Sequence, residues 1–336
     1  MGRINESFLA LDIGTEAVKV LVFERDNQTY HIWGAALEYF DESNPFNNDK
    51  VMVKMKEAIK QAGKTPKDIL LVPPANILKN RIHFQSIVRD NPQKIISKKE
   101  EQDIIDCIRK QDAEVIEFEI LDIKIDGYEI PKLIGYAGKN IEFRILVSFL
   151  PENYLDNLGL KFQKIINPVK KLAGIFVIGE GVFLDIGGKI TQIYLVRNAK
   201  IEMIDDFEGG GMDFTRAISQ TLGMSGRGAR DFKERYSRGE LTQLAEKKTK
   251  EILAIPAKEW SLKLKSKLQS MRGLIPSNFF IFGGGSQLPE IKELIVSDKA
   301  KVKFIYPKDF KNIIDNTGCV DNPQYTNLIL SIYNDY

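Results

Sequence analysis

The chain has 336 residues, enough to bury a large core and to form about two or three domains of ordinary size. Apolar residues make up 43% and charged residues 28%, a globular mixture rather than a disordered one. Lysine and arginine total 48 against 46 acidic residues, so a net charge of +2 argues against a nucleic-acid partner. Two cysteines, Cys107 and Cys319, are too few for a disulfide framework or a zinc site.

The sequence pattern predicts neither a targeting signal nor a membrane-spanning segment. Residues 1–7 are polar and form no secretory leader, and no apolar run approaches the roughly 20 residues that span a bilayer. Residues 327–336 lack the basic face of an amphipathic membrane anchor. We therefore expect a cytoplasmic, soluble protein without a direct membrane anchor, which would reach the inner face of the membrane only through a partner.

One local pattern occurs twice: an apolar strand, the tripeptide Asp-Ile-Gly, a small polar turn and a second apolar strand. The two copies span residues 9–23 and 182–196 and align without a gap. Each places β-rich runs on either side of a glycine-containing turn, which is typical of a β-hairpin. Two copies in the same frame indicate a duplicated fold with one hairpin in each of two lobes.

Between the hairpins, the chain changes character. Residues 49–62 predict an amphipathic helix and residues 69–72 a short strand. A strand is expected over 81–88, a helix over 97–109 that opens with a capping box (Ser97 and Glu100), strands over 115–125, 128–134 and 141–149, and a closing helix over 151–160. We interpret residues 79–163 as a small α+β subdomain inserted into the first lobe.

The second lobe opens at the second hairpin. A helical, charge-rich stretch covers about 215–272, a buried strand 279–282, a helix up to 296, a strand 302–306 and a last helix from about 324. Alternating strands and helices predict α/β architecture. The expected division is 1–78 with 164–180 for the first lobe, 79–163 for the insert, 181–214 with 278–336 for the second lobe, and 215–277 for a helical subdomain.

Three glycine clusters carry the predicted chemistry. Tight glycine turns point successive backbone N–H groups into a concavity that holds phosphate oxygens. An aspartate at each strand end suits Mg²⁺, which takes only one or two carboxylates and bridges phosphates. A third cluster between strand and helix lets a flat base and ribose approach the backbone. Each motif alone is also typical of structural turns, but the three in this order favour nucleotide binding.

These residues resemble the phosphate-1, phosphate-2 and adenosine motifs of the actin, Hsp70 and sugar-kinase superfamily, and the placement of the insert resembles FtsA and PilM. The resemblance implies an actin-like (ribonuclease H-like) two-lobed fold with a 1C-type (SHS2-like) insert, and ATP and Mg²⁺ as cofactors. By similarity, Asp12 and Asp185 would hold the metal, directly or through water, and serve catalysis. The other implied nucleotide contacts are Gly14, Thr15, Lys19, Gly187, Gly188, Thr191, Gly209, Gly210, Gly211, Lys233, Gly283, Gly284, Gly285 and Ser286.

The sequence departs from this family pattern at three places. Gln192 replaces an expected aspartate, Asn167 replaces the glutamate that often precedes the proline, and Arg230 stands where an acidic ribose contact is expected, unless Asp231 takes that role. No general base that would position the attacking water is evident. We therefore expect slow or absent ATP hydrolysis.

FtsA-like proteins link cell-division filaments to the membrane, and PilM-like proteins form a cytoplasmic ring in type IV pilus assembly. The resemblance thus implies an ATP-binding assembly or scaffold protein, acting by nucleotide-dependent self-association into a filament or ring. Its implied partner is a tubulin-like division protein or a pilus inner-membrane protein. Two alternatives stay open: a small-molecule kinase or phosphatase of the same superfamily, and a scaffold that binds but never hydrolyses its nucleotide.

Overall fold

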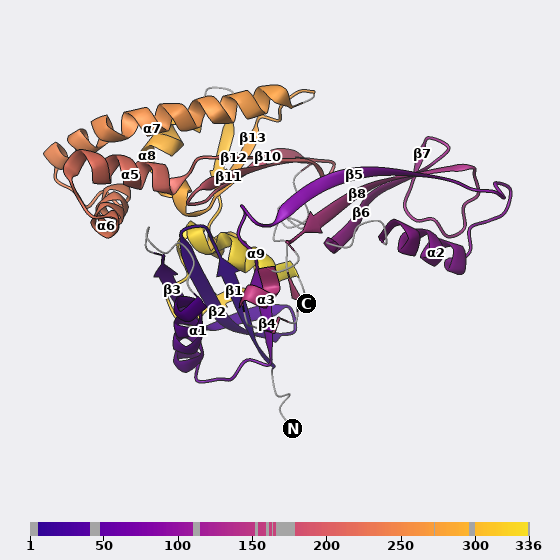
Figure 1. Cartoon of the computed structure of the whole chain (residues 1–336), viewed down its shortest axis with the longest axis horizontal. Helices are drawn as coiled ribbons and strands as arrows, with labels where there is room; N and C mark the ends of the chain where they lie inside the picture. The colour runs from indigo at the N-terminus through magenta and orange to yellow at the C-terminus, as the bar shows by residue number, and fades with distance from the viewer. Residues whose placement is uncertain are drawn as a thin grey trace.

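The computed structural model describes residues 6–40, 48–109, 115–151, 154–158, 161–162, 164–165, 179–271, 273–295 and 300–334. Within these ranges the strands form three sheets (Figure 1). The first has the order β15-β3-β2-β1-β4-β9, the second β12-β11-β10-β13-β14 and the third β5-β8-β6-β7. Both expected hairpins are confirmed, because β1 pairs with β2 and β10 with β11, each antiparallel. The fold is the predicted actin-like α/β architecture.

The first sheet is built around a continuous apolar hairpin. Its elements are β1 (Ser7–Ile13), β2 (Ala17–Asp26), β3 (Thr29–Tyr39), β4 (Asp68–Val72), β9 (Lys164–Ile165) and β15 (Ile313–Asp315). All seven residues of β1 are buried, as expected for a central strand covered on both faces. Helix α1 (Asn48–Ala62) covers one face with Val51, Met55 and Ala58, the apolar stripe that the sequence predicted.

The insert is an antiparallel sheet with one helix. It comprises β5 (Lys79–Val88), α2 (Lys98–Arg109), β6 (Val115–Ile125), β7 (Tyr128–Ile130) and β8 (Asn140–Phe149). Helix α2 starts as expected, because Ser97 Oγ accepts a hydrogen bond from the Glu100 backbone N–H. The sheet extends away from the two larger sheets, and the end with β7 lies furthest from them (Figure 1).

The second sheet and its helices form the other lobe. The strands are β10 (Glu180–Ile186), β11 (Ile190–Arg197), β12 (Lys200–Glu208), β13 (Asn278–Phe282) and β14 (Lys301–Phe304), and the helices are α5 (Gly211–Leu222), α6 (Gly226–Ser237), α7 (Gln243–Ser270) and α8 (Pro289–Ile295). One core cluster joins Phe214 of α5 and Leu253 and Trp260 of α7 to the strands. The lysine-rich helix α7 therefore packs its apolar side on this lobe.

The last helix, α9 (Thr326–Asn334), lies between the first and second sheets (Figure 1). Its residues Leu328, Ile329 and Ile332 are fully buried in one cluster with Phe8 of β1 and Phe183 of β10. Full burial explains why the helix is apolar on nearly every side. The two lobes thus share a core at this helix.

Two segments pack differently from the expected division of the chain. Helix α3 (Tyr154–Leu158), included in the insert from the sequence, buries Leu158 in the core cluster of the first sheet. Strand β15, assigned to the second lobe, pairs in parallel with β3 of the first sheet. Both reassignments depend on long-range packing, which the hydrophobic pattern of a short segment does not specify. Of the segment 164–180 that was expected to return to the first lobe, residues 166–178 lie outside the described residues.

Candidate functional site

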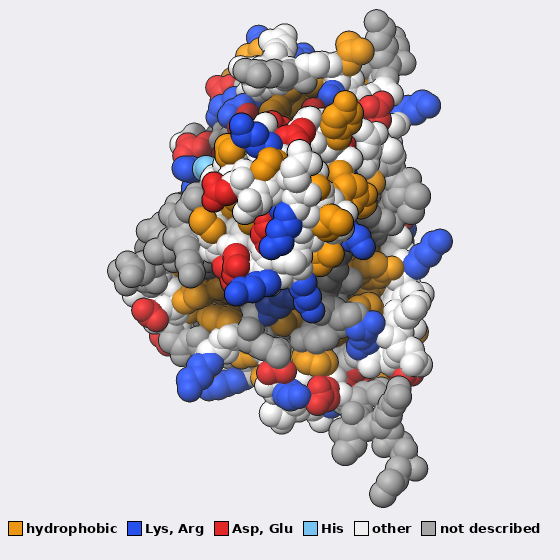
Figure 2. Space-filling view, turned by 90° about the vertical axis from the view of Figure 1, so that its right-hand side faces the viewer, with side chains coloured by type: hydrophobic (Ala, Val, Ile, Leu, Met, Phe, Trp, Pro, Cys, Tyr) orange, Lys and Arg blue, Asp and Glu red, His pale blue; other side chains and the backbone are white. Residues whose placement is uncertain are grey.

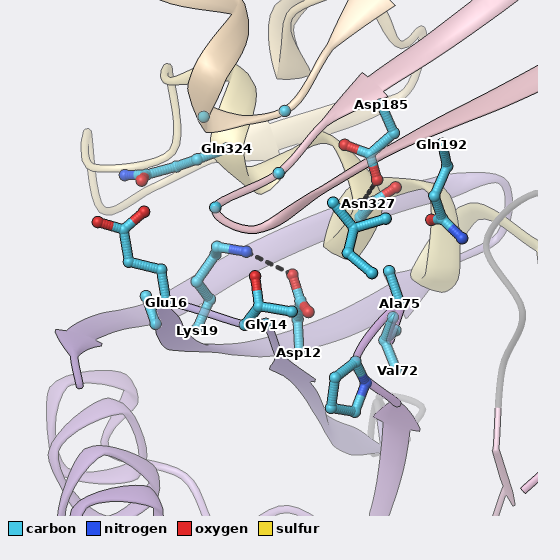
Figure 3. Close-up of a pocket in the computed structure, with 18 of the residues that line it drawn as sticks. Asp12, Gly14, Glu16, Lys19, Val72, Ala75, Asp185, Gln192, Gln324 and Asn327 are labelled. Carbon is cyan, nitrogen blue, oxygen red and sulfur yellow. Dashed lines mark hydrogen bonds and ion pairs between the residues drawn. The ribbon is translucent and has the colours of Figure 1, made fainter. Parts of the chain in front are cut away.

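A pocket between the two lobes collects most of the predicted site. Its empty space, including the open mouth, is about 860 Å³. The two glycine turns face each other across it (Figure 3). The predicted residues that line it are Asp12, Gly14, Thr15, Lys19, Asp185, Gly187, Gly188, Gly283 and Gly284.

The first-lobe turn places an acid and a base side by side. Asp12 and Lys19 are opposite one another in the β1–β2 hairpin, and Lys19 Nζ lies 2.6 Å from Asp12 Oδ2. Both side chains are largely buried yet line the pocket. The cross-strand register thus brings the point charge of Lys19 to the cavity, where an anion could bind it.

The second-lobe turn holds its aspartate differently. Asp185 Oδ2 accepts a hydrogen bond of 2.6 Å from Asn327 Nδ2 of α9. Burial raises the pKa of Asp185 to about 6, an increase that the Asn327 hydrogen bond and the Lys19 charge limit and the nearby Asp12 charge augments. A bound cation would favour the charged form of this carboxyl group. The opposite position in the hairpin holds Gln192, which also lines the pocket.

Backbone contacts fix the second turn on the start of α5. The Gly211 and Met212 N–H groups donate to the Gly187 and Gly188 carbonyls at 2.9 and 2.8 Å. A Cβ atom added at Gly210 would lie 2.4 Å from the Gly187 oxygen. Only glycine therefore permits this close approach, which accounts for Gly210 immediately before α5.

The third glycine cluster opens on the same pocket from β13. Gly283 has φ +87°, and a Cβ atom there would lie 2.4 Å from Asp185 Oδ1. Gly284 also lines an adjoining hollow, together with Gly285, Gly211 and Lys233. The pocket and the adjoining hollow share six lining residues: Glu16, Tyr39, Gly187, Gly188, Gly284 and Gln324.

Lys233 is buried at the edge of this hollow. Its Nζ donates to the Gly211 carbonyl at 2.8 Å and to Thr215 Oγ1 at 2.7 Å. Burial lowers the pKa of Lys233, against the opposing effect of the Glu16 and Glu234 charges. The lysine thus ties α6 to the start of α5 while it lines the hollow.

Four predicted contacts do not line the pocket or the adjoining hollow: Thr191, Gly209, Gly210 and Ser286. Thr191 lies on the opposite face of β11 from Gln192, because strand residues alternate, and its hydroxyl bonds to the Gly209 carbonyl. Gly209 lines a separate groove beside α5 and α7. Ser286 is buried, and its hydroxyl donates to the Gly283 carbonyl at 2.7 Å. The Thr191 and Ser286 hydroxyls thus bond to the backbone of the glycine segments.

A network of polar contacts joins the two lobes at the rim of the pocket, and the sequence did not predict it. Glu16 of the first turn accepts a hydrogen bond of 2.9 Å from Arg230 Nε of α6, and the Arg230 guanidinium lies 4.2 Å from the centroid of the Tyr39 ring. Tyr39 donates to Glu234 Oε1 at 2.7 Å. Burial and the Glu234 charge raise the pKa of Tyr39, so it stays a donor. A charged residue inside a phosphate-type turn, Glu16, was the one available signal.

The polar groups in the pocket suit a metal that is held mainly by phosphates and water. The described residues contain no cluster of three or more His, Cys, Asp or Glu side chains that could cage a metal ion. Asp12 and Asp185 both line the pocket, which matches the one or two carboxylates that Mg²⁺ usually takes from a protein beside phosphate oxygens. The donor set therefore fits Mg²⁺ with a polyphosphate and would hold a free ion poorly.

Comparison with known proteins finds relatives by sequence. No family model matches the chain. It is 25% identical to the cell division protein FtsA of Streptococcus pneumoniae serotype 2 (strain D39), over 96% of this chain and 78% of that protein. It is 22% identical to FtsA of Enterococcus hirae, over 96% of this chain and 81% of the relative.

Solved structures agree on the fold. A structure described as a PilM-PilN type IV pilus biogenesis complex matches with a TM-score of 0.69 at 18% identity, over 98% of both chains. The ethanolamine utilization protein EutJ of Carboxydothermus hydrogenoformans matches with a TM-score of 0.54 at 12% identity, over 98% of this chain and 90% of that one. The duplicated hairpins and the placement of the insert agree with these comparisons: the chain has the actin-like fold, and its sequence is similar to FtsA.

Proposed function

We propose that this protein binds ATP with Mg²⁺ between its lobes and acts as an assembly or scaffold protein of the FtsA and PilM type. The observation that carries the proposal is the shared pocket: Asp12 and Gly14 line one wall and Asp185 and Gly187 the other. Each turn offers backbone N–H groups to phosphate oxygens, and Lys19 adds a positive charge. Asp12 and Asp185 would hold the metal that neutralises the phosphates.

Hydrolysis of the bound nucleotide is proposed to be slow. Among the described lining residues, the carboxylates are Asp12, Glu16 and Asp185, and each already has a hydrogen-bonded partner. Gln192 and Asn327 offer amides, which can orient a water molecule but cannot accept its proton. A scaffold whose nucleotide is never hydrolysed is the second candidate, and Gln192 is the observation that favours it.

The insert supplies the surface proposed for self-association or partner docking. Phe84 and Val88 on the edge strand β5 and Tyr128 on β7 are exposed. Figure 2 looks onto the end of the molecule that holds this sheet and shows apolar side chains interspersed with basic and acidic ones. An edge strand with exposed apolar side chains can pair with another chain. We propose a tubulin-like division protein or a pilus inner-membrane protein as the partner, since the similar proteins are a cell division protein and a type IV pilus biogenesis complex.

Ligand-dependent stability tests the nucleotide proposal. At a concentration of about 100 times Kd, ATP with Mg²⁺ should stabilise the protein by about 2.7 kcal/mol, which raises Tm by about 5 °C. Asp12→Ala should abolish most of this shift. The matched control is Asp156→Ala, at an exposed position on α3 outside the pocket. No ATP-dependent shift in the wild-type protein would contradict the proposal.

Multiple-turnover phosphate release separates the two candidates. Sustained release that is lost in Asp12→Ala supports an active, slow ATPase, whereas bound ATP that stays intact supports the non-hydrolysing scaffold.

Sedimentation with ATP and with ADP then tests assembly. We expect ATP to increase the mass of the particles, and replacing exposed Phe84 and Tyr128 by serine should reverse this increase. Equal sedimentation in ATP and ADP would contradict nucleotide-dependent self-association.

A further inference from the structure

The carboxylate of Glu16 lies where the two halves of the nucleotide pocket meet. Glu16 belongs to the first-lobe turn and lines both the pocket with Asp12 and the hollow with Lys233. Its side chain is only 13% exposed. Oε1 accepts the hydrogen bond from Arg230. Oε2 has no hydrogen bond within the described part of the chain and lies near Gly188 and Gly211, where their Cβ atoms would be 3.0 and 3.8 Å away.

Arg230 holds this carboxylate in place and does not itself line either hollow. Its guanidinium stacks on the Tyr39 ring, and Nη2 donates to the Phe40 carbonyl at 3.4 Å. The ion pair is largely buried, with side-chain exposures of 10% and 13%. A buried arginine that is fixed on three sides is a positioning group for Glu16, and it leaves Oε2 of Glu16 beside Gly188 and Gly211, which line the adjoining hollow.

The chemistry of a nucleotide limits what Glu16 can contact. A carboxylate only accepts hydrogen bonds, and phosphate groups at neutral pH offer it no donor. The donors of an adenine nucleotide are the ribose hydroxyls and the amino group of the base. Glu16 lies between the phosphate-type turns and the hollow lined by Gly284 and Gly285, which is the expected place of the ribose.

We propose that Glu16, positioned by Arg230, recognises the ribose hydroxyls and makes the site selective for ribonucleotides. This inference rests on the proposed ATP-binding function. It also accounts for the arginine at position 230: Nε of Arg230 is as many bonds from its Cβ as a glutamate oxygen would be, and it lies 2.9 Å from the Glu16 carboxylate. The acidic group is thus supplied from the opposite lobe, at nearly the same point in space. Because a first-lobe group then contacts the ribose, ribonucleotide binding would draw the lobes together.

The test compares ATP, 2′-deoxy-ATP and 3′-deoxy-ATP, each with Mg²⁺, by isothermal titration calorimetry. A hydrogen bond to a charged acceptor corresponds to a preference of about tenfold or more for ATP over at least one deoxy analogue. Glu16→Ala should bring that ratio close to one. The matched control is Glu57→Gln, an exposed carboxylate on α1 that should keep the wild-type ratio.

Exchanging the charges of Glu16 and Arg230 distinguishes a loss of ribose recognition from general damage to the fold. Arg230→Glu alone places two carboxylates together and should lower the affinity for all three nucleotides. Glu16→Arg combined with Arg230→Glu should restore the preference for ATP. A wild-type ratio near one, an unchanged ratio in Glu16→Ala, or tighter ATP binding by Glu16→Ala would overturn the inference. The last result would mean that Glu16 blocks the nucleotide. Absence of binding by any adenine nucleotide would instead overturn the proposed function itself.

Discussion

The two lobes contain the same three-stranded unit, β1-β2-β3 in the first and β10-β11-β12 in the second, and the copies differ at both ends. Their glycine turns close alike: the Gly14 N–H donates to the Ala17 carbonyl at 2.8 Å, and the Gly187 N–H donates to the Ile190 carbonyl at 3.0 Å. The backbone cradle is therefore duplicated. The residues around each turn are not duplicated, so the two copies are expected to make different contacts with one ligand.

The first difference is the residue opposite the aspartate. In the first lobe Asp12 faces Lys19, and in the second Asp185 faces Gln192. The first turn thus presents a nearly neutral ion pair, whereas the second presents a buried carboxyl group with amide neighbours. Phosphate attraction is expected mainly from the first lobe, and the second lobe is better suited to hold a cation.

The second difference is the support behind the turn. The start of α5 packs its backbone directly on the second turn through Gly210. The first turn is held by separate hydrogen bonds: the Phe40 N–H donates to the Glu16 carbonyl at 2.8 Å, and the Lys189 N–H donates to Thr15 Oγ1 at 3.0 Å. The second turn is therefore fixed by close backbone packing and the first by individual hydrogen bonds. This predicts unequal tolerance to substitution.

The largest expected effect follows from Gly210→Ala. The added methyl group would meet backbone oxygens of the second turn, so either the turn or α5 must move, at a cost of about 2–3 kcal/mol. We expect a lower Tm and loss of ATP binding. Gly179→Ala is the control, because a Cβ atom there would meet no atom within 4 Å. Equal Tm values for the two variants would show that the close packing does not constrain the turn.

The next largest effect is expected from exchanging Lys19 and Gln192, the residues opposite the two aspartates. Lys19→Gln makes the first turn like the second and removes a charge from the pocket, so ATP affinity should fall about tenfold to hundredfold. Gln192→Lys makes the second turn like the first and should not reduce ATP affinity. Calorimetric titration measures both. If Lys19→Gln bound ATP as tightly as the wild type, the division of work between the lobes would be wrong.

The sequence predicted the repeated hairpins and most of the helices because local patterns encode them. Asp-Ile-Gly flanked by apolar strands specifies both a turn and its position relative to the sheet. The helix start at Ser97 was likewise readable from its capping residues. The repeat indicated one glycine turn in each of two lobes, and the structure places both turns on one pocket.

Other parts of the site could not be predicted, since they come from contacts between distant segments. Asn327 reaches Asp185 only because α9 packs between the sheets, and nothing near residue 327 signals this. The Glu16–Arg230 bond joins positions 214 residues apart. Thr191 was misplaced for a simpler reason: adjacent strand residues face opposite sides, and the cross-strand register makes Gln192 the counterpart of Lys19.

The smallest expected effect concerns the far ends of the two units. The β2–β3 turn is exposed and bonded only locally at Asn27, whereas Lys200 at the β11–β12 turn reaches Asp122 and Glu129 of the insert. Burial raises the pKa of Asp122, but hydrogen bonds from Lys200 and Arg144 lower it by more. Because the folded pKa lies below the unfolded value of about 3.9, the contribution of Asp122 to stability is present above that pH and is lost as the pH falls through the folded value.

Asp122→Asn should therefore lower the free energy of unfolding at pH 7, by about 1 kcal/mol or less because the cluster is partly solvated. The difference from the wild type should shrink as the pH falls below about 4, which urea denaturation at a series of pH values would measure. Asp26→Asn, in the turn of the first lobe, is the matched control and should change little, because Asp26 bonds only to its exposed neighbour Asn27. A constant difference across this pH range would show that Asp122 acts through packing, and the insert would then be held on the second lobe by shape instead of charge.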